Sequence, residues 1–121
     1  MSSDPRHHLG VLGERLAAEH LERLGYEVVA RNHRTRYGEI DLVVADADTL
    51  VVVEVKSRRG RGSPWDNLDE RKRRQVRRMG IAYLTDVPDR PRRRDVRFDA
   101  VGVTFDAAGR MVSLDHLEAA F

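Results

Sequence analysis

Glu54 and Lys56 stand two positions apart in residues 50–57, a run that is otherwise largely apolar and rich in Val. If this run is a β-strand, the two side chains project from the same face, because alternate residues of a strand share a face. Burying two charges in a central strand costs several kcal/mol unless they are paired or bind a metal ion. Asp41 poses the same question in the preceding run, residues 38–45. These three residues are therefore candidates for a chemical site.

The lengths of these two runs predict that Asp41 meets Glu54. A hairpin that turns through a two-residue loop pairs positions that sum to 95, which places Asp41 opposite Glu54. Other loops with an even number of residues also place Asp41 and Glu54 on the same face of the sheet. Glu39, Asp41, Glu54 and Lys56 would then share one face of the sheet, with two or three carboxylates beside a single ammonium.

Two interpretations of this acidic cluster are open. One is a structural salt-bridge cluster, although its surplus of carboxylates leaves the charges poorly balanced. The other is a site for a hard divalent cation, Mg²⁺ or Mn²⁺, which prefers carboxylate and water oxygens. In phosphodiester hydrolysis such an ion lowers the pKa of a water and neutralises the phosphate, while a lysine orients the water or stabilises developing charge. This chemistry would assign metal binding to Asp41 and Glu54 and catalysis to Lys56.

Lysine is an uncommon residue in this chain. Among 22 Lys and Arg residues, only Lys56 and Lys72 are lysines. A guanidinium does not replace a compact ammonium whose pKa can shift, so the lysine at position 56 gives modest support to a chemical role.

The positive charges gather in one third of the sequence. Residues 58–97 hold 14 Arg or Lys residues against six acids, a local excess of +8, although the whole chain carries only +2. Such segregation is typical of a protein that binds a polyanion. The alternative is a solvated basic helix face in a chain that favours Arg.

The spacing of apolar residues predicts a single α/β domain over residues 9–121, preceded by a flexible tail over residues 1–8. The third strand is nearly continuous in Val, which predicts burial on both faces. The expected elements are a helix over 9–24, antiparallel strands over 26–35, 38–45 and 50–57, a loop over 58–67, a helix over 67–85 capped by Asp66 or Asn67, a strand over 96–105 and an edge strand over 111–114.

Composition excludes several classes of protein. The absence of Cys rules out disulfide scaffolds, thiol catalysis and Cys-based zinc sites. No apolar run approaches the ~20 residues needed to cross a bilayer, and the opening MSSDPRHH lacks the profile of a signal peptide. We therefore expect a cytoplasmic protein with no membrane partner. The five His residues show no metal-binding spacing, and Asp99 is expected to be structural.

The segment GEIDLVVADADTLVVVEVKSR resembles the D-x(n)-E-x-K core of the restriction-endonuclease-like nucleases. From residue 10 to residue 121, the chain resembles the YraN-like family of small, poorly characterised bacterial proteins of that fold. The order and spacing of GEID, EVKSR and RFD make the resemblance specific. Further supporting features are Gly13-Glu14 with Ala17 and Ala18, Arg31-Asn32 before GEID, and Ala82-Tyr83-Leu84 in the basic helix.

The resemblance implies an α-β-β-β-α-β core with a mixed sheet, similar to that of archaeal Holliday junction resolvases. In those enzymes a Glu of the first helix joins an Asp and a Glu of the hairpin around a divalent metal ion. By this resemblance, Glu14, Asp41 and Glu54 would bind Mg²⁺ or Mn²⁺ and Lys56 would be the motif lysine.

The sequence departs from related nucleases at two positions. Ile40 stands where a Pro often precedes the Asp. Met79 stands where RecB-type nucleases carry a Tyr, although Gln75 is on the inward side of the same helix. The motif of that clade is therefore incomplete.

The residues expected to contact nucleic acid flank this centre. The basic second helix and the loop after residue 57 would hold phosphates without reading sequence. Arg31 would contact phosphate or pair with Glu14, and Trp65 would stack on a base or pack its own loop. The small number of aromatic residues argues against base stacking as the main mode of binding. The candidates for binding are Arg31, Arg58, Arg59, Lys72, Arg73 and Gln75.

Together these patterns predict a metal-dependent endonuclease that hydrolyses DNA phosphodiesters and recognises structure, such as branched DNA, rather than sequence. Resolvase-like cutting of two strands would require a homodimer. The alternative is a non-catalytic nucleic-acid-binding module of a DNA repair, recombination or RNA-processing assembly, in which the acidic cluster is structural. The YraN-like family carries no established activity, so catalysis is inferred from the fold alone.

Overall fold

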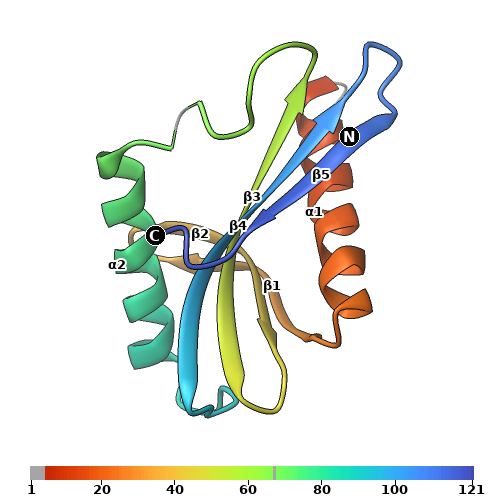
Figure 1. Ribbon diagram of the computed structural model, residues 1–121. Helices are drawn as coiled ribbons and strands as arrows, with labels where there is room; N and C mark the ends of the chain where they lie inside the picture. Colours follow the sequence, from red (N-terminus) through yellow and green to blue (C-terminus); the bar gives the residue numbers. More distant parts are fainter. Residues whose placement is uncertain (1–4, 67) are drawn as a thin grey trace.

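A five-stranded sheet lies between two helices in the computed structural model, which describes residues 5–66 and 68–121 (Figure 1). The element order contains the predicted α-β-β-β-α-β core, and the predicted edge strand, which extends to Leu117, completes the sheet. The prediction of a single α/β domain with a mixed sheet is confirmed. The elements are α1 (Pro5–Arg23), β1 (Glu27–Thr35), β2 (Gly38–Ala45), β3 (Thr49–Arg59), α2 (Glu70–Asp86), β4 (Asp95–Phe105) and β5 (Met111–Leu117).

Helix α1 includes residues that the sequence assigned to a flexible tail. The helix is described from Pro5 to Arg23. Residues 5–8 are therefore helical, and residues 1–4 of the predicted tail lie outside the described residues. The helix ends as predicted before Gly25, whose φ of 98° is a conformation that glycine adopts without strain.

The sheet is mixed because β3 and β4 run parallel, whereas the other neighbouring strands are antiparallel. Parallel strands need a crossover connection, and α2 supplies it on one face of the sheet. Strands β1, β2 and β3 form the predicted antiparallel meander. The strand order β1-β2-β3-β4-β5 follows the sequence, with β1 and β5 at the edges.

The hairpin of β2 and β3 has the predicted register but ends one position short of the acidic pair. Leu42 pairs with Val53, so the paired positions sum to 95 as expected. The ladder stops there, and Asp41 and Glu54 lie immediately beyond it. Asp41 uses its side chain instead, because its Oδ2 accepts a hydrogen bond of 2.7 Å from the N–H of Val55. The acidic pair therefore lies where the two strands separate.

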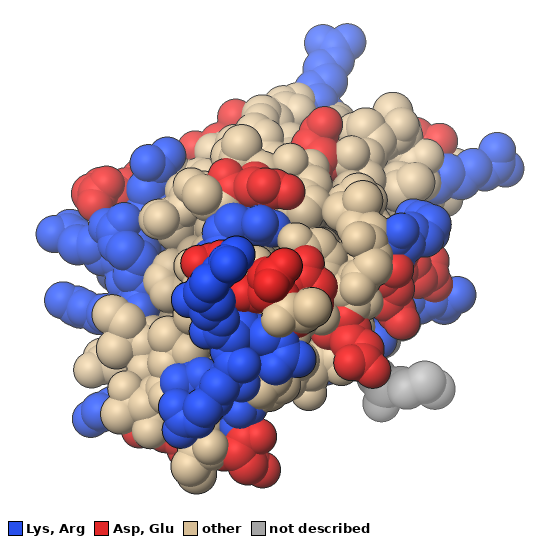
Figure 2. All heavy atoms as spheres, turned by 60° about the horizontal axis from the view of Figure 1, so that its bottom comes forward, with Lys and Arg blue, Asp and Glu red and all other residues tan. Residues whose placement is uncertain are grey.

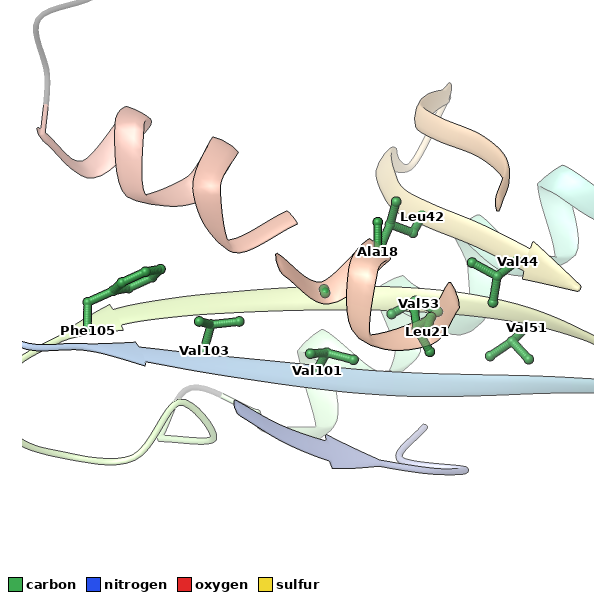
Figure 3. Packing of buried hydrophobic residues seen from close by; sticks show 10 residues of the cluster. Ala18, Leu21, Leu42, Val44, Val51, Val53, Val101, Val103 and Phe105 are labelled. Carbon is green, nitrogen blue, oxygen red and sulfur yellow. The ribbon is translucent and has the colours of Figure 1, made fainter. Parts of the chain in front are cut away.

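Strand β3 is buried on both faces, as its Val-rich sequence predicts. Val51 and Val53 point toward α1, where they pack near Leu21 (Figure 3). Leu50 and Val52 point to the other side, into a second core with side chains of α2. Glu54 continues the second series, so its carboxylate faces α2 rather than α1.

Helix α2 begins later than predicted. Asp69 is its N-cap, and the Oδ1 of Asp69 accepts a hydrogen bond of 2.9 Å from the N–H of Lys72. Asp66 serves the preceding loop instead, where its Oδ2 accepts a hydrogen bond from the N–H of Ser63. The other expected cap, Asn67, lies outside the described residues. Neither α1 nor α2, as far as the chain is described, is long and apolar enough to cross a membrane.

Candidate functional site

Asp41 is a half-buried carboxyl group in a negatively charged environment. Burial raises its pKa to about 8, and the negative charges of Glu54 and Glu14 act in the same direction. The hydrogen bond from Val55 and the charge of Lys72 lower the pKa, but they do not offset the other effects. Burial and the neighbouring acids therefore favour the protonated form of Asp41.

Glu54 is a buried carboxylate held by both lysines of the chain. Its Oε1 lies 3.0 Å from the Nζ of Lys72 and 3.7 Å from the Nζ of Lys56. The contact with Lys56 agrees with the expectation that both side chains share one face of β3. The contact with Lys72 comes from α2, and sequence reasoning missed it by assigning Lys72 to phosphate binding only. The rarity of lysine in this chain was the signal that could have found it.

Glu14 lies on the other side of this centre and has a partner that the sequence did not predict. Asn32 donates hydrogen bonds of 2.7 Å to Oε1 of Glu14 and 3.0 Å to Oε1 of Glu39. Asn32 has a φ of 49°, in the left-handed region that Asn tolerates better than most residues. Sequence reasoning placed Asn32 only in a family motif, although its tolerance of this conformation was a usable signal.

The expectation that Glu39 shares a face with Glu54 and Lys56 is wrong. Ile40 packs into the core beside α2, so its neighbour Glu39 points away from that core, toward Glu14. A groove of about 440 Å³ follows this acidic side of the molecule. It is lined by Gly10, Val11, Glu14, Asn32 and Glu39.

The predicted set of three metal-binding carboxylates is not drawn together. Within residues 5–66 and 68–121, no three Asp, Glu or His side chains converge closely enough to hold a metal ion. Glu54 and Glu14 both act on Asp41 through their charge, Glu54 more strongly, and Glu14 is bound by Asn32. Mg²⁺ is often held by one or two carboxylates together with water and phosphate. Asp41 and Glu54 fit that arrangement.

A basic groove of about 640 Å³ lies along α2 and reaches this centre at Lys72. Its opposite wall is Tyr37, in the turn between β1 and β2, and Gln75 joins the two walls through a hydrogen bond of 3.0 Å to the carbonyl oxygen of Tyr37. Figure 2 shows basic side chains gathered over one face of the molecule, with acidic side chains among them. The groove is lined by Tyr37, Asp69, Arg71, Lys72, Arg74, Gln75 and Arg78.

The residues expected to bind nucleic acid do not form one surface. Lys72 and Gln75 line the basic groove, whereas Arg73 is exposed on α2 outside its lining. The side chain of Arg58 is tied to its own loop, because its Nε donates a hydrogen bond of 2.7 Å to the carbonyl oxygen of Arg61. Arg59 is exposed at the end of β3.

Two residues for which sequence reasoning left alternatives open are placed by the structure. Arg31 is exposed on β1, and the partner of Glu14 is its neighbour Asn32. Trp65 is half-buried, and its loop packs on β4 at Gly102, where an added Cβ would lie 3.0 Å from the Trp65 ring. Trp65 therefore packs its own loop.

Asp99 has the structural role that was expected. It is fully buried, and Arg97 donates two hydrogen bonds to it, of 2.8 and 2.9 Å. The ring of His116 and the N–H of Ala119 also bind this carboxylate. Burial tends to raise the pKa of Asp99, but these donors outweigh it and leave the pKa below its ordinary value. The network stabilises the sheet and lies apart from the carboxylate–lysine centre.

Comparison with known proteins identifies the family. The model of "Uncharacterised protein family UPF0102" matches residues 13–103. A UPF0102 protein of Nocardia farcinica is 45% identical and is aligned over 93% of this chain and 88% of its own length. A UPF0102 protein of Pelotomaculum thermopropionicum is 40% identical over 98% of this chain and 99% of its own length. The chain therefore belongs to the uncharacterised protein family UPF0102, the family to which the YraN-like resemblance pointed.

Proposed function

We propose that this protein is a metal-dependent nuclease that hydrolyses phosphodiester bonds of DNA in the cytoplasm. The observation that carries the proposal is the placement of Asp41 and Glu54 where β2 and β3 separate, with two ammonium groups on Glu54. This centre opens beside a basic groove of about 640 Å³. Two neighbouring carboxylates flanked by two ammonium groups, next to a surface that attracts polyanions, fit a divalent cation and a phosphate together.

Each residue has a defined part in this proposal. Asp41 and Glu54 would hold Mg²⁺ or Mn²⁺, which would supply Lewis-acid chemistry for a phosphate oxygen and for the acidity of a water. Lys56 is partly exposed, so its ammonium faces solvent beside Glu54 and donates hydrogen bonds to the phosphate or the attacking water. The Arg residues of the groove hold the nucleic-acid backbone through its phosphates, without reading sequence.

A cleavage assay with matched variants tests this function. Branched, linear duplex and single-stranded DNA are incubated with the protein in Mg²⁺ or Mn²⁺, and RNA is included to determine which nucleic acid is cut. We expect Asp41→Asn and Glu54→Gln each to lower the cleavage rate by about 10²-fold or more. Glu22→Gln replaces an exposed acid of α1 and serves as the control, with an expected rate close to that of the wild type. Equal rates in all four proteins would overturn the assignment of this site.

Cleavage of both strands of a branched substrate requires two such centres. We therefore propose that the form active on branched DNA is a homodimer. Sedimentation of the protein with a four-way junction measures the number of copies bound. A single copy that cuts both strands would contradict this arrangement.

A second function is favoured by one specific observation. The charge of Glu54 is already offset by Lys56 and Lys72, and within the described residues no third acid joins Asp41 and Glu54. Such a centre also suits a nucleic-acid-binding module of a repair, recombination or RNA-processing assembly, with a structural salt bridge. For that function we expect no cleavage of any substrate. Glu54→Gln should bind DNA more tightly because it removes a negative charge, whereas Asp41→Asn should do so only above about pH 8, where Asp41 itself is charged.

A further inference from the structure

The two lysines of this chain converge on one oxygen atom. Lys56 comes from β3 and Lys72 from the first turn of α2, yet both ammonium groups approach Oε1 of Glu54, at 3.7 and 3.0 Å. The other cationic residues, among 22 Lys and Arg in total, are all Arg. Because the two lysines lie 16 positions apart, the docking of α2 against the sheet brings them together rather than local sequence.

The position of Lys72 is not one that helix stability favours. It is the third residue of α2, and a cation in the first turn meets the positive end of the helix dipole. Its N–H is bound by the cap residue Asp69, which anchors the backbone at this point. The negative charge of Glu54 offsets the unfavourable placement of the ammonium. A role at Glu54 therefore explains a lysine that the helix itself does not need.

Lys72 also connects the buried carboxylate with the basic groove. The side chain of Glu54 is 8% exposed and that of Lys72 is 22% exposed, so a ligand in the groove reaches the lysine before the carboxylate. An ammonium carries three donors, and the contact with Glu54 leaves others free to turn toward a ligand. A guanidinium holds its N–H donors in one rigid plane, so it does not direct some donors to Glu54 and others to a ligand in this way.

We propose that Lys72 is a positioning residue of the reaction centre, which orients the carboxylate of Glu54 and guides a backbone phosphate from the groove toward it. The proposal rests on the nuclease function argued above. It gives Lys72 a part that the other cations of the groove do not share. Arg71, Arg74 and Arg78 line the same groove and hold only the backbone.

The test compares Lys72→Met and Lys72→Arg with the control Arg74→Met in the full-length protein. Three quantities are measured: the cleavage rate at saturating DNA with Mn²⁺, the DNA affinity in EDTA, and the Mn²⁺ affinity by calorimetry without DNA. Lys72→Met is expected to cut about 10²-fold more slowly, whereas its DNA affinity falls no more than that of Arg74→Met. Lys72→Arg keeps the charge but does not restore the rate. Should Lys72→Met fail to fold in a thermal unfolding control, Lys72→Gln takes its place.

The Mn²⁺ titration separates failure of this inference from failure of the nuclease function. Loss of the ammonium 3.0 Å from Glu54 should tighten Mn²⁺ binding several-fold in Lys72→Met, whereas Arg74→Met should bind Mn²⁺ as the wild type does. Any of three results would overturn the role of Lys72. Lys72→Met could lose no more cleavage activity than Arg74→Met, or it could bind Mn²⁺ with unchanged affinity. Lys72→Arg could keep full activity. If the wild type cuts no nucleic acid, the nuclease function falls, and the Mn²⁺ titration alone decides whether Lys72 controls Glu54. A wild type that also binds no Mn²⁺ would overturn both.

Discussion

Asp41 holds its proton more tightly in the folded protein than in the unfolded chain, because burial and the charge of Glu54 raise its pKa from 3.8 to about 8. Between these two values, each unit of rising pH costs the folded state up to about 1.4 kcal/mol. We therefore expect the contribution of Asp41 to the free energy of unfolding to fall as pH rises through this range in the metal-free protein. Asp41→Asn removes this dependence, because its amide oxygen accepts the hydrogen bond from Val55 without carrying charge.

Urea unfolding in EDTA at about pH 5 and about pH 8 measures this effect. Asp41→Asn should be more stable than the wild type at the higher pH, and the difference should shrink at the lower pH. Glu22→Gln, at an exposed position on α1, controls for the loss of an acid as such. A profile of Asp41→Asn parallel to that of the wild type would contradict the crowding of charge around Asp41.

At this scale the sequence was informative about some residues and not about others. Asp41 and Glu54 could be placed on one face of the sheet from sequence alone, because every hairpin loop with an even number of residues puts their side chains on the same face. Lys72 and Asn32 could not be placed, because their contacts depend on how α2 and β1 lie against the sheet. The prediction for Glu39 was wrong because it assumed that side chains alternate regularly between the two faces through the position where β2 separates from β3.

Helix α1 contains two glycines, one packed closely against the sheet and one not, so substitutions at them test helix propensity and packing separately. A Cβ at Gly13 would collide with the side chain of Ser57 on β3, whereas a Cβ at Gly10 would meet nothing within 4 Å. Gly10→Ala should therefore raise the free energy of unfolding by up to about 1 kcal/mol. Gly13→Ala should lower it by about 1–3 kcal/mol, because α1 must move away from the sheet.

Thermal or urea unfolding of these two variants provides the measurement. If Gly13→Ala is as stable as Gly10→Ala, α1 does not lie as close to β3 as described. The displacement should also move Glu14, the next residue, away from Asn32. Chemical shifts of the Asn32 side-chain amide report that movement, and they should stay unchanged in Gly10→Ala.

The elements themselves were largely predictable, except where several residues competed for one role. The strands followed from runs of Val and other β-formers, and the helices from the spacing of apolar residues. The start of α2 was misplaced because three acids or amides within four positions, Asp66, Asn67 and Asp69, could cap it. The loop uses Asp66 to bind the N–H of Ser63, which leaves Asp69 for the helix. A sequence pattern does not reveal that division of tasks.

Asp99 joins segments from across the whole molecule. Its carboxylate binds Arg97 of β4, His116 of β5 and the backbone of Ala119, and Arg97 donates in turn to the hydroxyl of Tyr26 beside β1. Asp99→Ala should lower the free energy of unfolding by about 3 kcal/mol, near the lower limit for breaking a buried ion pair, because Arg97 keeps some contact with water. Urea unfolding at neutral pH measures this loss, and a loss below about 1 kcal/mol would contradict the central role of Asp99.

Asp41 and Asp99 impose opposite pH dependences on the stability of the molecule. The pKa of Asp99 is lowered, so its contribution is present above the ordinary value of 3.8 and is lost as pH falls through the lower folded value. The contribution of Asp41 changes in the other direction and over a higher pH range. Acid unfolding of the wild type and of Asp99→Asn distinguishes the two effects, because only Asp99→Asn should lose the low-pH transition.

The segregated charge of the whole molecule predicts a salt-dependent affinity for DNA. Each phosphate contact that is lost lowers the slope of log affinity against log salt concentration by about 1. Arg74→Ala, in the lining of the basic groove, should produce that change for every DNA sequence tested. Arg110→Ala, an exposed cation in the turn before β5, is the control and should leave the slope unchanged. Equal slopes for both variants and the wild type would show that DNA does not follow this groove.

The parallel pairing of β3 with β4 sets the order in which this centre is completed during synthesis. Thr49 pairs with Asp95, so paired residues of the two strands are 46 positions apart, and the ribosome must add the 35 residues that separate the end of β3 from the start of β4. The hairpin that carries Asp41 and Glu54 depends on nearby residues and forms early, whereas α2 gains its full platform only after β4 has been made. The nascent chain thus holds both acids and Lys56 before α2 docks and brings Lys72 to them, and the finished centre is among the last parts of the protein to form.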